Sequence, residues 1–84
     1  MREKIKEFFI NTNLVPDNLK NEFNDDLNLI DNGIIESFNI ISLVIFIENN
    51  FNIKFSSRDM SATNFKTIKT IEELILRKIK ERDE

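Results

Sequence analysis

The chain has a single glycine, Gly33, and a single proline, Pro16, in 84 residues. All-β folds need many tight turns, and glycine and proline supply much of the special backbone geometry that such turns require. The sequence therefore argues against an all-β fold and favours an all-α protein. A chain of this length has room for one small domain, which we expect to span residues 1–84.

Charge and residue types exclude several functions. The formal net charge of -3 argues against a nucleic-acid binder, because phosphate backbones are bound by clustered lysine and arginine. The absence of histidine and cysteine removes the commonest general base, the thiol nucleophile, the disulfide and most zinc sites. The longest apolar run, residues 43–47, is too short to span a bilayer. We expect a cytoplasmic protein with no membrane span, no metal site and no catalytic residues of its own.

Helical spacing of apolar residues marks both ends of the chain. Near the start, Ile5, Phe8 and Phe9 follow the i, i+3, i+4 pattern of a helix that ends near Asn11 or Asn13. Near the end, Thr67 is expected to cap a second such helix. The apolar face of this last helix comprises Ile68, Ile71, Leu74, Ile75 and Ile79.

Less regular segments connect these helices. Residues 13–36 form a long connection in which one lysine faces six acidic residues, a net charge of -5, with a helical turn possible over residues 19–23. A short helix is expected over residues 56–62, opened by Ser56 or Ser57, with Phe65 in the link that follows. The acidic excess of the chain therefore lies in one segment.

Residues 37–51 predict a helix that is apolar nearly all round, with Ser37 as its N-cap. A strand over residues 40–47 is an alternative, but the length and the lack of alternation favour a helix. One face suits the core and comprises Ile40, Leu43, Val44, Ile47 and Phe51. A second face, made of Phe38, Ile41 and Ile45, is left over, and we expect it to bind a partner.

Most candidate chemistry fails on residue types. The Asp25-Asp26 pair has no basic residue or apolar pocket in view and is best interpreted as solvated loop. A calcium loop with Gly33 at its sixth position would need a ligand at Ile30, which cannot supply one. What remains is residues 31–38, where an acid precedes Ser37 at the start of an apolar helix. From spacing alone, Ser37 as a simple helix cap is the commoner interpretation.

The segment Gly33-Ile34-Ile35-Glu36-Ser37-Phe38 resembles the Gly-apolar-apolar-Asp-Ser-(Leu/Met/Phe) element of the acyl carrier protein family, which includes peptidyl and aminoacyl carrier domains. One position departs, since Glu36 stands where the family has Asp. The resemblance continues over residues 48–53, similar to the family's E-x-x-F-x-(I/V), and over residues 60–68, similar to L-T-x-x-N-F-x-(S/T)-(I/V). It covers essentially the whole chain.

The resemblance implies a monomeric four-helix bundle with three long helices, a short third helix and a long first loop. It also implies that Ser37 is the attachment site of 4′-phosphopantetheine, with Gly33, Glu36 and Phe38 completing the motif. A phosphopantetheinyl transferase would move the group from coenzyme A and supply the base and magnesium. The thiol of the group would then hold an acyl or aminoacyl cargo as a thioester.

The second helix departs from the usual fatty-acid carrier, in which it is acidic. Here the corresponding positions are polar but uncharged, and only Glu48 is retained. Apolar contact through Phe38, Ile41 and Ile45 should therefore matter more than electrostatic steering. We favour a dedicated carrier that serves an acyl- or aminoacyl-activating ligase, or a synthase or transferase, in a biosynthetic pathway. A housekeeping fatty-acid carrier and an unmodified helical interaction module are the alternatives.

Overall fold

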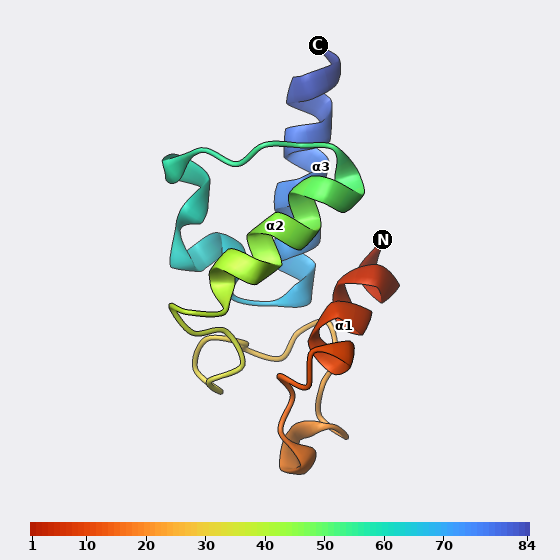
Figure 1. Ribbon diagram of the computed structural model, residues 1–84, viewed down its shortest axis with the longest axis vertical. Helices are drawn as coiled ribbons and strands as arrows, with labels where there is room; N and C mark the ends of the chain where they lie inside the picture. The colour runs from red at the N-terminus through yellow and green to blue at the C-terminus, as the bar shows by residue number, and fades with distance from the viewer.

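Three helices surround one apolar core in the computed structural model, which describes residues 1–84 and contains no strand (Figure 1). The helices are α1 (Arg2–Asn11), α2 (Ile40–Phe51) and α3 (Ile68–Asp83). Three 3-10 turns lie between them: η1 (Asp17–Leu19), η2 (Ser57–Met60) and η3 (Ala62–Phe65). The predicted all-helical class is confirmed.

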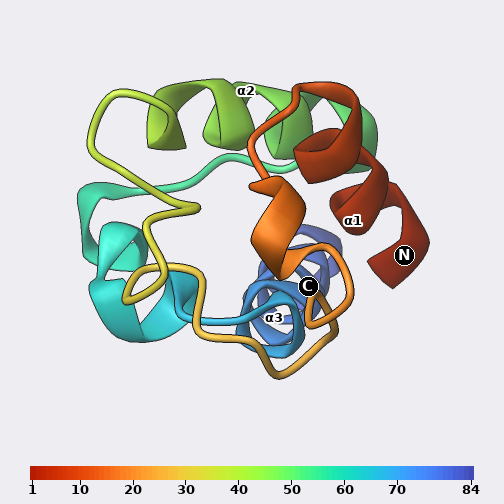
Figure 2. The ribbon, with the colours of Figure 1, turned by 90° about the horizontal axis from the view of Figure 1, so that it is seen from below.

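Helix α3 runs along the longest axis of the molecule (Figure 1). Figure 2 looks nearly along it and shows α1, α2 and the segment with η2 and η3 arranged around it. The C-terminal turns of α3 project beyond the other elements, which gives the chain its elongated dimensions of 42 × 22 × 20 Å. None of the three helices is both long enough and apolar enough to cross a membrane.

The first and last helices bury the faces that their spacing predicts. In α1 the buried residues are Ile5, Phe8 and Phe9. The helix ends at Asn11. The Thr12 hydroxyl then donates to the Phe8 carbonyl, and Asn13 adopts a positive φ of 61°. The predicted cap of α3 is confirmed, since the Thr67 hydroxyl accepts from the Thr70 N–H at 3.0 Å. The buried residues of α3 are Ile68, Ile71, Leu74 and Ile75.

Helix α2 begins at Ile40, three residues later than the sequence predicts, and the strand alternative for this segment is wrong. Its core side is centred on Leu43 and Ile47, both fully buried. The helix ends at Asn52, whose left-handed backbone (φ 54°) stops it. Arg82 of α3 then donates to the free carbonyls of Phe51 and Asn52, at 2.9 and 3.0 Å.

Two short turns replace the helix expected over residues 56–62. Ser56 caps η2 through a reciprocal pair of hydrogen bonds with Asp59, but Ser61 is extended and ends the turn before η3 begins. Phe65 is not a link residue. It ends η3 and is fully buried, with its ring edge-on to Phe55 at a centroid distance of 5.9 Å.

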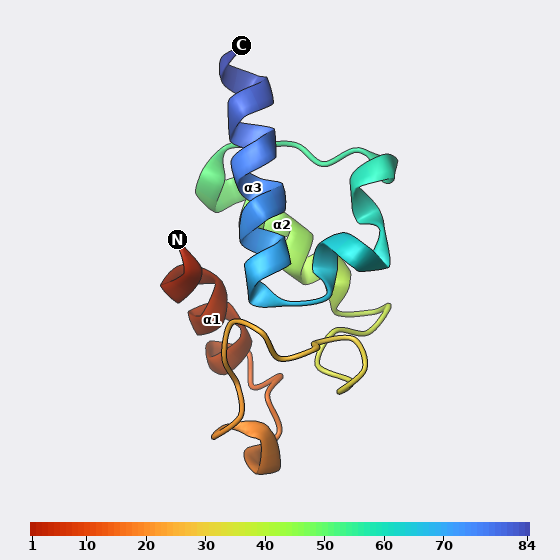
Figure 3. The same cartoon turned by 180° about the vertical axis from the view of Figure 1, so that it is seen from behind.

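The long connection between α1 and α2 is tied to the rest of the fold. It contributes Val15, Leu29, Ile34 and Ile35 to the core, and the Leu29 N–H donates to the Lys66 carbonyl at 2.7 Å, just before α3. Figure 3 shows it folded around the lower ends of α1 and α3.

An ion-pair network fastens the same connection to two helices. The Asp25 carboxylate pairs with Arg2 and Lys6 of α1, each at 2.7 Å, and Arg2 also pairs with Glu72 of α3 at 2.8 Å. The hydrogen bonds from Lys6 and Arg2 hold the pKa of Asp25 below its usual value. Asp25 is therefore a structural anchor, and Asp26 beside it is exposed.

Candidate functional site

Ser37 lies exposed in a tight turn over residues 36–39 that leads into α2. The Glu36 carbonyl closes this turn by accepting from the N–H groups of Asn39 and Ile40, both at 3.1 Å. Ser37 is therefore not the N-cap of α2; Asn39 occupies that position. The correction frees the serine hydroxyl, since none of the hydrogen bonds that close the turn uses it.

Asn39 locks the turn from the inside. Its side chain is only 8% exposed, its Oδ1 accepts from the Glu36 N–H at 2.7 Å, and its Nδ2 donates to the Ile34 carbonyl at 2.9 Å. These bonds staple the two ends of the segment that carries Ser37. The sequence prediction missed this role, although an Asn directly before an apolar helix is itself a cap signal.

The turn is connected to α3 by a chain of main-chain hydrogen bonds. The N–H groups of Ile34 and Ile35 both donate to the Leu29 carbonyl, at 2.9 and 3.0 Å. The Leu29 N–H in turn donates to the main-chain carbonyl of Lys66, which lies just before α3. Gly33 makes the bend that starts this arrangement, with a φ of 72° that other residues rarely adopt. Main-chain hydrogen bonds thus connect the motif to Leu29 and, through Leu29, to the segment before α3.

An apolar hollow of about 240 Å³ opens beside Ser37. Its near wall belongs to the site turn and the start of α2, and its far wall belongs to η2 and η3. The lining residues are Ile30, Ile35, Glu36, Ser37, Ile40, Met60, Ser61, Ala62 and Phe65. A group attached to Ser37 could therefore contact this apolar surface.

The far wall of this hollow is fixed to α3 through Asp59. The Asp59 carboxylate accepts from the Ser56 N–H at 2.8 Å and pairs with Lys78 at 2.9 Å. Partial burial opposes ionisation of Asp59, but the hydrogen bonds from Ser56 and Lys78 outweigh it and keep its pKa below the usual value. The same contact raises the pKa of Lys78. Both groups are thus charged at neutral pH.

The apolar face predicted on the second helix is exposed. Phe38 is 71% exposed, Ile41 62% and Ile45 52%. Ile41 and Ile45 lie about one turn apart in α2, and Phe38 lies in the turn that precedes the helix. Large side chains this exposed and this close together are typical of a surface that another molecule covers. Phe38 places this surface directly beside the serine.

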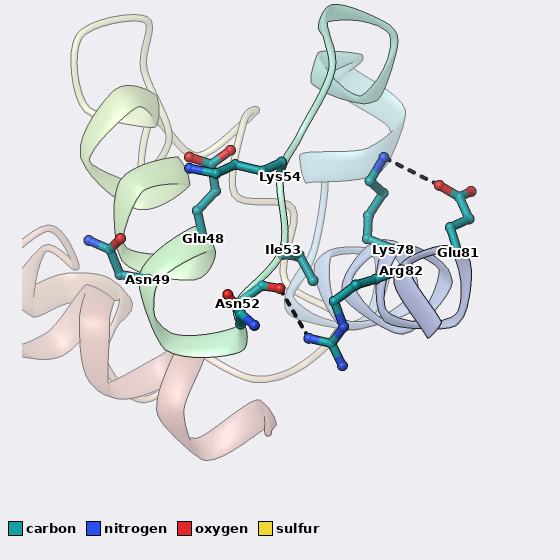
Figure 4. A pocket seen from close by; sticks show the side chains of 8 residues that line it. All are labelled: Glu48, Asn49, Asn52, Ile53, Lys54, Lys78, Glu81 and Arg82. Carbon is teal, nitrogen blue, oxygen red and sulfur yellow. Dashed lines mark hydrogen bonds and ion pairs between the residues drawn. The ribbon is translucent and has the colours of Figure 1, made fainter. Parts of the chain in front are cut away.

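A larger hollow of about 480 Å³ lies between the C-terminal end of α2 and α3, and its walls are mostly charged or polar (Figure 4). Most of its charged groups have partners within the fold, since Lys78 reaches Glu81 at 3.3 Å and Arg82 reaches the Asn52 carbonyl; Lys54 is the exception. Glu48 accepts from the Phe55 N–H at 2.9 Å. These contacts are internal to the fold, so the smaller hollow is the better candidate site.

No group of three or more acidic side chains is arranged to hold a metal ion. What the fold and site define is a small all-helical protein that presents Ser37, an exposed serine without a side-chain hydrogen bond, beside an apolar hollow that Ser61 also lines. The chain matches no protein-family model and no curated protein.

Proposed function

We propose that this chain is a carrier protein of the acyl carrier type, in which Ser37 takes a 4′-phosphopantetheine group from coenzyme A. The observation that carries the proposal is the free, exposed Ser37 hydroxyl held in a rigid turn at the start of α2. A modifying enzyme needs an accessible hydroxyl and a fixed backbone shape to recognise. The likeness of residues 33–38 to the carrier element supplies the identity of the group.

The surroundings of Ser37 fit such a group. Its hydroxyl gives no hydrogen bond that modification would break, and the open apolar hollow beside it leaves room for a flexible arm. When bound, the group would supply a thiol for carrying acyl or aminoacyl cargo as a thioester, which the cysteine-free chain lacks. Ile35, Ile40 and Met60 would shield the apolar part of the arm or cargo from water.

The overall arrangement also supports the proposal. A carrier bundle has a long first loop and a short third helix; the long 13–36 connection is compatible with the first, and two 3-10 turns, η2 and η3, would take the place of the second. As in other carriers, the chemistry would belong to partner enzymes, a phosphopantetheinyl transferase first and an acyl- or aminoacyl-activating ligase next. The exposed Phe38, Ile41 and Ile45 would dock these partners in the cytoplasm, with the carrier as a monomer.

The test is transfer of the group in vitro. The purified chain is incubated with coenzyme A, magnesium and a promiscuous transferase, and its intact mass is measured. We expect a mass gain equal to one phosphopantetheine, retained in Ser42→Ala, which removes the exposed serine of α2, and lost in Ser37→Ala. A gain that persists in Ser37→Ala contradicts the proposal. Glu36→Asp restores the family residue, so failure of both wild type and Glu36→Asp also contradicts it.

An unmodified interaction module is the second candidate, favoured by the exposure of the Phe38, Ile41 and Ile45 face. The two candidate functions predict different effects of the Ser37→Ala substitution. If the chain works as an unmodified module, Ser37→Ala keeps full partner binding while Ile41→Asp abolishes it. If the chain is a carrier, Ser37→Ala abolishes cargo loading even where a partner still binds.

A further inference from the structure

The bend before the site contains the dipeptide Asn32-Gly33, and the proposed function assigns no role to the Asn32 side-chain amide. Asn32 is exposed to water, and Gly33 has no side chain to crowd its own main-chain nitrogen. A Cβ added at Gly33 would meet only the Glu36 Oε1, at 3.8 Å. An unhindered nitrogen next to a carboxamide is the arrangement in which an asparagine side chain cyclises most readily.

We propose that Asn32 is a site of spontaneous deamidation, and that opening of the turn over residues 28–33 sets its rate. The Gly33 nitrogen attacks the Asn32 Cγ, a new C–N bond forms, and the bond to Nδ2 breaks. Ammonia leaves with the proton from Gly33, and a five-membered succinimide remains. Water then adds to either carbonyl of the ring and gives aspartate or isoaspartate. Water is the only co-reactant.

In the folded turn both reacting groups are held by hydrogen bonds to other residues. The Gly33 N–H donates to the Ile30 carbonyl at 3.1 Å, and the Asn32 Nδ2 donates to the Asn28 carbonyl at 2.8 Å. Attack on the Asn32 Cγ requires both hydrogen bonds to break. The reaction therefore proceeds from a locally opened form, whose population is small in the native state.

Asn28 is the residue that keeps the turn closed. Its Oδ1 accepts from the N–H groups of Ile30 and Asp31, at 3.1 and 2.8 Å, and its Nδ2 donates to the Asp31 carboxylate at 3.0 Å. Replacing it with alanine removes these bonds but leaves its main-chain carbonyl in place. Asn28→Ala should therefore raise the population of the opened turn without touching the reacting atoms.

The product changes the segment that leads to Ser37. Either product adds one negative charge to residues 13–36, which already carry a net charge of -5. Isoaspartate also adds a main-chain methylene within the turn over residues 28–33. Ageing of the protein would therefore produce a second form that differs in the segment before Ser37.

The experiment is peptide mapping by mass spectrometry of the full chain, aged at mildly alkaline pH, with aspartate and isoaspartate peptides separated. Asn50 is the matched internal control, because it is also exposed and its Nδ2 also donates to a carbonyl four residues earlier at 2.8 Å, but Phe51 follows it. We expect conversion at Asn32 and none at Asn50 over the same period. Equal conversion at both positions, or no conversion at Asn32 in fully unfolding urea, overturns the proposal.

The role of the turn has its own test. We expect Asn28→Ala to deamidate about tenfold faster at Asn32 than wild type, the factor that corresponds to about 1.4 kcal/mol. Unfolded wild type sets the upper limit of the rate, and circular dichroism checks that the variant is folded. If the variant does not fold, wild type in urea below its unfolding midpoint replaces it, and acceleration at Asn32 is expected there. An unchanged rate contradicts control by the turn.

Discussion

Replacing Asn39 with alanine tests whether this side chain, rather than Ser37, organises the start of α2. The change removes two hydrogen bonds, one to the Glu36 N–H and one from Nδ2 to the Ile34 carbonyl. Glu36 is exposed, so water can replace the first bond at a net cost of about 0.5–1 kcal/mol. Ile34 is fully buried, so its carbonyl loses its partner at a cost of about 1–3 kcal/mol. Together these terms predict a loss of about 1.5–4 kcal/mol.

The assay is urea unfolding at neutral pH, followed by circular dichroism. Asn49→Ala is the matched control, because Asn49 is an exposed asparagine of the same helix and its loss should change the free energy of unfolding by less than about 0.5 kcal/mol. Asn39→Asp keeps an oxygen that can accept from Glu36, but it places a carboxylate oxygen against the buried Ile34 carbonyl, so we expect a loss at least as large as that of Asn39→Ala. Equal stability of Asn39→Ala and Asn49→Ala would refute the assignment of Asn39 as the residue that locks the turn.

Three further predictions concern the rest of the fold. The pKa of Asp59 is lower in the folded state than its usual value of 3.8, so its contribution to stability is present at neutral pH and is lost as the pH falls below about 4. Asp59→Asn removes this contribution. The variant should therefore show a smaller difference between its urea midpoints at neutral and acidic pH than wild type. Phe65→Ala should lower the free energy of unfolding, measured in urea, by about 3–5 kcal/mol. Phe38→Ala changes a largely exposed side chain and should lower it by less than about 0.5 kcal/mol. Similar losses of free energy in the two variants would contradict the burial of Phe65. Ser37→Ala should leave the urea midpoint unchanged, and a clear drop would mean that the hydroxyl is bonded within the fold.

Amphipathic periodicity predicts the helices well because it depends on one segment at a time. The face of α1 and the Thr67 cap of α3 both follow from residues within one or two turns of each other. The exposed Phe38, Ile41 and Ile45 face was also predictable, because α2 carries more apolar residues than its partners can cover. These parts required no knowledge of contacts between distant segments.

The site turn depends on contacts that the sequence pattern does not reveal. Ser and Asn are almost equally good caps, so composition alone does not choose between Ser37 and Asn39. The choice is made by the buried Ile34 carbonyl, which needs a donor and finds the Asn39 amide. The far wall of the hollow is equally non-local, because Asp59 is fixed by Lys78 of α3. Lys78 is too far from Asp59 in sequence for periodicity to show that pair.

The hydrogen-bonded path from the site turn to Lys66 has a consequence for the order of events during synthesis. Ser37 leaves the ribosome well before Lys66 and the core residues of α3, yet its turn is anchored on Leu29, which is itself bonded to Lys66. The hydrogen-bonded path that anchors the turn is therefore complete only after residue 66 has been made. An enzyme that recognises Ser37 by the shape of this turn would leave nascent chains alone and act on completed ones.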